Sequence, residues 1–71
     1  MPEDVKAHIT GVVFQISTQP GDAVAAGDAV IVLESMKMEI PVEAPRSGLV
    51  KEITVAEGET VQEGDTVAVL E

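Results

Sequence analysis

The 71-residue sequence contains no cysteine and only one aromatic residue, Phe14. Without cysteine, neither a disulfide framework nor a thiolate metal site can stabilise so short a chain. Positive charge is also scarce, because three lysines and one arginine stand against 13 acidic residues, which gives a net charge of −9. Such a charge argues against nucleic acid and against an anionic membrane surface as partners.

Signals for export and for catalysis are equally sparse. We find no long apolar run and no signal peptide, and together with the lack of cysteine this predicts a cytoplasmic location without membrane contact. The single histidine, His8, has no second histidine or cysteine at ligand spacing and belongs to no Ser/His/Asp constellation. We therefore expect no metal site, no catalytic residue and a protein that is not an enzyme in its own right.

The apolar residues that are present are mostly β-branched. Twelve valines and five isoleucines outnumber three leucines, and such side chains suit a pleated, half-buried surface better than a helix. A chain of this length hides only about 60% of its unfolded surface, so its core must be thin. Composition therefore predicts one small all-β domain that spans residues 1–71.

An internal repeat dominates the sequence. A shift of 37 residues places 7–34 over 44–71 without a gap, and 12 of the 28 positions are identical, including all three glycines of each half. Each half reads as strand, turn, short strand, turn and strand, which in the first half are 11–16, 23–24 and 29–33. Neither half could bury its valines alone. The repeat therefore predicts two sheets packed face to face and related by a pseudo-two-fold axis.

Four glycine–acid pairs recur with the repeat. We attribute them to tight turns rather than to calcium or phosphate binding, because glycine supplies the positive φ that a type II turn requires. They are Gly21-Asp22, Gly27-Asp28, Gly58-Glu59 and Gly64-Asp65.

The segment between the halves, 35–43, has no copy in this alignment. Its second part alternates like a half-buried strand, and Pro41 predicts that this strand is an edge or that the proline occupies a non-bonded position. The chain must reverse near Met36 and Lys37, where no glycine, asparagine, aspartate or proline is available. Places where local rules fail are expected to be functional or strained. This singles out Lys37, which we expect near the pseudo-two-fold axis.

Lys37 could be an ordinary solvated charge, but its neighbours favour a function. Two of the chain's three methionines flank it, and flexible apolar side chains at an exposed tip are hard to explain by packing. The four-carbon stem of a lysine, extended by a long acyl chain, would make a tether that swings between sites. Three functions remain open: a biotin carrier, a lipoyl carrier and a small β interaction module with an unmodified lysine.

The segment Glu34-Ser35-Met36-Lys37-Met38 resembles the E-A-M-K-M box of biotinyl domains, in which the lysine between the methionines carries biotin. Related lipoyl domains typically have D-K-A at this place. The resemblance covers essentially the whole chain and implies a flattened barrel-sandwich of two four-stranded antiparallel sheets, with Lys37 at a hairpin tip. It also implies covalent biotin on Lys37 as a swinging arm, attached by a biotin protein ligase that recognises Glu34, Ser35, Met36 and Met38.

The resemblance further implies a biotin carboxyl carrier. Such a domain shuttles carboxybiotin between the biotin carboxylase and carboxyltransferase active sites of a biotin-dependent carboxylase. Ser35 stands where the family usually has alanine, a change between small residues. The short loop at 18–21 leaves no room for the protruding thumb of some carriers. The chain is therefore most similar to thumbless carrier domains and to free-standing biotin/lipoyl attachment proteins.

Overall fold

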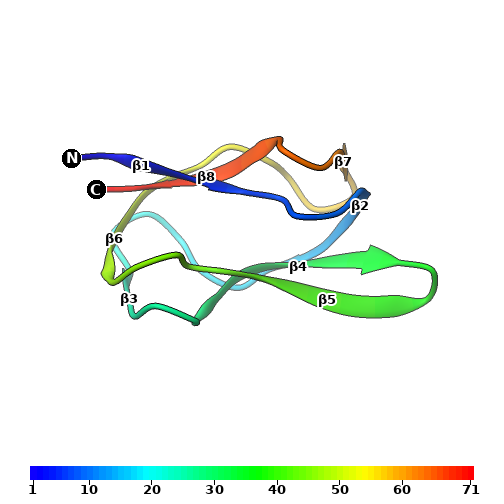
Figure 1. Cartoon of the computed structure of the whole chain (residues 1–71), viewed down its shortest axis with the longest axis horizontal. Helices are drawn as coiled ribbons and strands as arrows, with labels where there is room; N and C mark the ends of the chain where they lie inside the picture. The colour runs from blue at the N-terminus through cyan, green and yellow to red at the C-terminus, as the bar shows by residue number, and fades with distance from the viewer.

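A computed structural model describes residues 1–71 and contains eight β-strands (Figure 1). The strands are β1 (Glu3–Lys6), β2 (Gly11–Ile16), β3 (Ala23–Val24), β4 (Ala29–Ser35), β5 (Met38–Glu43), β6 (Gly48–Ile53), β7 (Thr60–Val61) and β8 (Thr66–Leu70). They form two four-stranded sheets, β1-β8-β6-β3 and β5-β4-β2-β7, in which all neighbours are antiparallel. The predicted all-β architecture of two sheets is confirmed. The structure contains no helix with the length and hydrophobicity that a membrane-spanning segment requires.

The repeat relates the two sheets to each other, because the shift of 37 residues places strands of one sheet over strands of the other. A shift of 37 residues places β2, β3 and β4 over β6, β7 and β8, and it also places β1 over residues 40–43 of β5, with Val5 matching Val42. The prediction that all of 35–43 lacks a copy is therefore wrong for its second part. Strand β1 was not predicted from the sequence. It is short and Val5 is its only buried residue, so it shows no periodic pattern.

The same shift relates the two ends of the molecule. Glu34 and Met38 at the β4–β5 hairpin match Glu71 and Met1 at the chain termini, and Figure 1 shows the hairpin at the end opposite the labelled N and C. An operation that exchanges these ends has its axis between them. Lys37 therefore lies far from the pseudo-two-fold axis, contrary to our expectation. Only residues 35–37 have no counterpart within the sequence.

The core between the sheets is entirely aliphatic. Fourteen valine, leucine, isoleucine and alanine residues are buried, and no polar side chain is buried with them. Each sheet takes strands from both halves, because β7 joins β2 and β3 joins β6. Backbone hydrogen bonds interlock the halves further: the N–H of Gly21 donates to the Val50 carbonyl and that of Gly58 to the Val13 carbonyl, both at 2.8 Å. The two halves thus complete each other, as the burial argument requires.

The four glycine–acid pairs form four copies of one turn. Each glycine has a φ between 89° and 96°, and the acidic residue that follows donates its N–H across the turn at 3.0–3.1 Å. Its carboxylate accepts a hydrogen bond from the backbone N–H three residues earlier, at 2.9–3.0 Å. The first copy is the turn Gln19–Asp22, with Pro20 and Gly21 in the central positions of a type II turn. The assignment of these pairs to turns is confirmed.

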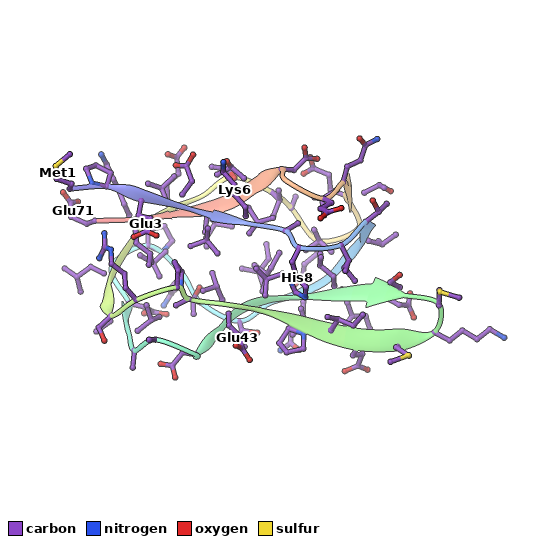
Figure 2. The ribbon with its side chains drawn as sticks, in the orientation of Figure 1. Met1, Glu3, Lys6, His8, Glu43 and Glu71 are labelled. Carbon is purple, nitrogen blue, oxygen red and sulfur yellow. The ribbon has the colours of Figure 1, made fainter.

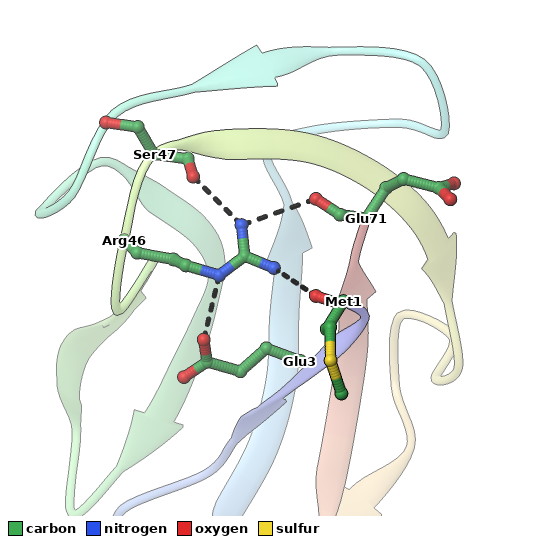
Figure 3. Close-up of polar contacts among 5 residues, drawn as sticks. All are labelled: Met1, Glu3, Arg46, Ser47 and Glu71. Atoms are coloured by element: carbon green, nitrogen blue, oxygen red, sulfur yellow. Dashed lines mark hydrogen bonds and ion pairs between the residues drawn. The ribbon is translucent and has the colours of Figure 1, made fainter.

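At the end opposite the hairpin, one arginine holds the termini together (Figure 3). Arg46 donates from Nε to Glu3 Oε1 and from Nη2 to the Met1 carbonyl, both at 2.8 Å. Its Nη1 donates to the backbone oxygens of Ser47 at 3.0 Å and Glu71 at 3.3 Å. The exposed ion pair itself stabilises the fold by at most about 1 kcal/mol. The hydrogen bonds of Arg46 thus link the two chain ends, as the covalent turn links β4 and β5 at the hairpin end.

Candidate functional site

The hairpin that carries Lys37 is held in a strained backbone conformation. Ser35 of β4 pairs with Met38 of β5, so Met36 and Lys37 alone make the turn. Their φ angles are 54° and 65°, the pattern of a type I′ turn, which normally takes residues such as Asn-Gly. An L-residue with a side chain pays about 1–2 kcal/mol for the left-handed conformation. The predicted reversal and its strain are both confirmed.

The side chains at the tip are free of the protein body. Met36 is 91% exposed, Met38 is 61% exposed and Lys37 is exposed between them. Figure 2 shows the side chains of this end extending away from the body, at the end opposite the labelled Met1 and Glu71. Lys37 makes no ion pair, since the one salt bridge of the structure joins Arg46 and Glu3. The amine is therefore accessible to a modifying enzyme, and nothing blocks a long covalent substituent.

The residues of the expected recognition motif lie together at the hairpin. Glu34 of β4 faces Glu39 of β5 on the outward side, and both are exposed. Like charges directly opposite each other in adjacent strands are destabilising. Ser35 is half-buried, and its partner Met38 is exposed. Two carboxylates thus flank the base of the turn at a local cost to stability.

Strand β5 is an edge, and its proline blocks that edge. It pairs only with β4, in the order β5-β4-β2-β7. Hydrogen-bonded pairs alternate with non-bonded ones from the two-residue turn onward, so Pro41 opposite Val32 occupies a non-bonded pair. Its missing N–H therefore points away from β4, where a further strand would bind. Both alternatives predicted for Pro41 are confirmed together.

The remaining predicted residues lie elsewhere. His8 is exposed in the loop between β1 and β2, near the middle of the molecule in Figure 2. Lys6 and Lys51 are exposed on β1 and β6, in the sheet that does not contain the hairpin. The loop between β2 and β3 spans residues 17–22 and ends in the tight turn Gln19–Asp22. Lys37 is therefore the only lysine associated with the sheet β5-β4-β2-β7.

One residue that supports the hairpin was not identified from the sequence. A Cβ added to Gly11 would lie 2.8 Å from the Glu34 carbonyl oxygen and 3.5 Å from Leu33 Cβ. Strand β2 can therefore approach β4 this closely only with glycine at this place. A Cβ added to Gly48, its counterpart, would lie 2.6 Å from Arg46 Nη1 and 3.2 Å from the Glu71 carbonyl oxygen.

We expect Gly11→Ala to lower the free energy of unfolding by about 1–3 kcal/mol, because backbone atoms of β4 must move. Gly48→Ala is the matched comparison and should cost less than Gly11→Ala, because its Cβ first meets the end of the Arg46 side chain, which can move at the cost of exposed hydrogen bonds. Urea unfolding of the unmodified chain measures both changes. Equal losses in the two variants would contradict the proposed close packing of β2 on β4.

Replacing Met36 by asparagine should stabilise the unmodified chain by about 0.5–1 kcal/mol, since asparagine tolerates the left-handed conformation better than methionine. Met38→Asn is the control, because Met38 lies in a strand, and we expect no gain there. Thermal or urea unfolding distinguishes them. A loss of stability in Met36→Asn would show that the turn stores no such strain.

Comparisons with known proteins agree with this geometry. The family model Biotin_lipoyl, described as "Biotin-requiring enzyme", matches residues 1–70. Over 44 residues the chain is 52% identical to the "Biotinylated protein TB7.3" of Mycobacterium tuberculosis, a segment that covers 62% of each protein. Over 43 residues it is 44% identical to the "Biotin/lipoyl attachment protein" of Bacillus subtilis, covering 61% of this chain and 59% of that protein.

A solved structure matches the entire chain. The urea carboxylase of Kluyveromyces lactis contains a segment with a TM-score of 0.95 and 39% identity, which covers 100% of this chain and 6% of that one. The matched segments thus span less than two thirds of the curated relatives and a small part of the carboxylase. Because the family model matches almost the whole chain, the chain belongs to the Biotin_lipoyl family.

Proposed function

We propose that Lys37 is the residue to which biotin is covalently attached, and that residues 1–71 form a single biotinyl domain acting as a biotin carboxyl carrier. The observation that carries this proposal is the tip itself. Lys37 occupies a strained two-residue turn, makes no ion pair and lies between two exposed methionines. Packing explains none of these features, whereas presentation of a lysine to other proteins explains all of them.

The chain holds Lys37 in an accessible position and does not itself catalyse formation of the bond to biotin. In the attachment step the Lys37 nitrogen attacks an activated carboxyl group of biotin, an amide bond forms, and the activating group leaves. A protonated amine has no free electron pair, so the attacking nitrogen must first be deprotonated. No carboxylate lies within ion-pair distance of Lys37 to take the proton. We therefore assign the general base to the modifying enzyme, a biotin protein ligase.

Biotin, when bound, accepts a carboxyl group at one active site and releases it at another. The rigid hairpin fixes where the tether begins, and the exposed lysine stem leaves the tether free to move. We propose biotin carboxylase and carboxyltransferase components as the two partners, and the chain itself as non-catalytic. The likeness to a segment of a urea carboxylase supports carboxylase partners. A cytoplasmic location, where such components would meet it, remains our prediction.

A lipoyl carrier is the second candidate, since the name of the Bacillus subtilis relative includes both cofactors. The methionines on both sides of Lys37 favour biotin. An unmodified β interaction module is the third. Intact mass spectrometry of the chain, after incubation with biotin protein ligase, ATP and biotin or with lipoate ligase, ATP and lipoate, separates all three. We expect one biotinyl addition per chain. A chain left unmodified under conditions that label a control carrier would refute the carrier function.

A further inference from the structure

The outward side of β2 exposes two apolar residues, Val12 at 38% and Phe14 at 48%. Phe14 is the only aromatic residue of the chain, and it is the extra residue of a β-bulge. Val13 pairs with Leu33 and Gln15 with Val32, so two steps along β2 match one step along β4. A bulge of this kind redirects a side chain from the ladder. Phe14 follows buried Val13 in the strand alternation, so its ring lies on the same exposed side as Val12.

The repeat supplies an internal control for this position. The matching bulge on β6 lies between Val50 and Glu52, and its extra residue is Lys51. The same place in the same fold thus accepts a charged, solvated side chain. The fold therefore does not require an aromatic residue at Phe14. Such a residue is a candidate for a contact surface, since aromatic residues are enriched where proteins contact each other.

The apolar strip of Val12 and Phe14 runs to the base of the Lys37 hairpin. Val12 pairs with Glu34 on one side and with Thr60 of β7 on the other. Glu34 precedes Ser35, whose pairing with Met38 closes the turn that carries Lys37. The strip is thus continuous with the attachment site.

The strip is bordered by acidic residues on both sides. Glu34 and Glu39 lie at the hairpin side, while the opposite side carries Glu57, whose carboxylate accepts the Ile16 N–H, and Glu59, whose carbonyl accepts the Val13 N–H. The strands of this sheet contain no lysine or arginine. A second copy of the same acidic face would be repelled, so the complementary partner surface is apolar with basic residues around it.

We propose that Val12 and Phe14 form a contact surface for the biotin protein ligase, continuous with the hairpin, and that the ligase meets it with an apolar patch edged by lysine or arginine. This inference depends on the proposed function. A specific interface buries about 800 Å² on each partner, more than a few tip side chains supply, so the ligase contact must extend onto the domain body.

The reach of the lysine favours the ligase over the carboxylase partners. Before modification only a four-carbon stem separates the amine from the backbone, so the enzyme that modifies it must lie directly against the domain. After modification the longer tether lets other active sites be reached with the body held further away. The apolar face next to the hairpin is therefore most useful in the attachment step.

Steady-state kinetics of biotin attachment by a purified biotin protein ligase, with the full unmodified chain as the varied substrate, tests the inference. We expect Val12→Lys and Phe14→Lys each to raise KM about tenfold, because each removes an apolar contact and places a charge against a basic rim. We expect kcat to change little, because Lys37 is unaltered. Leu49→Lys is the matched control: Leu49 is the repeat counterpart of Val12, is 49% exposed on the other sheet, and gives the same change in charge.

Thermal unfolding of each variant, expected to match the unsubstituted chain within a few degrees, shows that KM reports contact rather than folding. Equal KM values in all variants, or an equal rise in Leu49→Lys, would overturn the inference while leaving the carrier function intact. A dimer of the unmodified chain in sedimentation that Phe14→Lys dissociates would also overturn it, since the face would then bind a second copy. Failure of the unsubstituted chain to be labelled would instead refute the proposed function.

Discussion

Replacing Lys37 by arginine is expected to abolish biotin attachment completely. A guanidinium group stays protonated at any accessible pH and offers no nucleophilic amine, whereas its charge and length resemble those of lysine. Because Lys37 is exposed and makes no ion pair, the free energy of unfolding should change by no more than about 0.5 kcal/mol. Intact mass after incubation with ligase, ATP and biotin measures the loss, and urea unfolding confirms that the fold is unchanged.

The two other lysines provide the controls for this experiment. Lys6→Arg and Lys51→Arg remove exposed lysines on the opposite sheet and should be labelled as fully as the unsubstituted chain. Residual labelling of Lys37→Arg, located at Lys6 or Lys51 by peptide mapping, would show that the site assignment is wrong.

Truncating Leu33 to alanine is expected to leave much of the chain unfolded. Leu33 is fully buried in β4, and deleting a buried leucine side chain costs about 2–5 kcal/mol. A domain of this size, without disulfides or metal, has only about 3–5 kcal/mol of stability to lose. Urea unfolding followed by circular dichroism should therefore show little or no folded baseline.

The repeat and the surface supply two comparisons for Leu33→Ala. Leu70 is the repeat counterpart of Leu33 and is equally buried, so Leu70→Ala should cost a similar amount. Leu49 is half exposed, and Leu49→Ala should cost less than about 1 kcal/mol. A loss below 1 kcal/mol for Leu33→Ala would mean that the two sheets do not depend on this shared core.

Most of the site could be predicted from the sequence because it rests on local chemistry. The reversal at Met36 and Lys37 followed from the end of the apolar strand 29–33 and the start of an alternating segment, and the strain followed from the lack of turn residues. The four glycine turns were equally predictable, since each depends on a few adjacent residues. The prediction of biotin as the cofactor depended on the resemblance of five consecutive residues to a known motif.

Other features of the site were not predictable because they depend on residues distant in sequence. Strand β1 becomes a strand only by pairing with β8, 60 to 67 residues away, and its own four residues have no distinctive pattern. The close approach of Gly11 to the Glu34 carbonyl is likewise a contact between strands. The position of the pseudo-two-fold axis was misjudged because the centre of the sequence is not the centre of the molecule.

The sequence alone therefore determined the all-β class, the repeat, the glycine turns and the lysine that lies where the repeat is interrupted, because periodicity and turn preference act over a few residues. The tertiary structure alone decided which strands pair and where the hairpin stands relative to the termini. It also decided that the exposed face of β2, with Phe14, lies beside the acidic base of that hairpin. Register and packing between segments far apart in the chain set these features, and no local pattern encodes them.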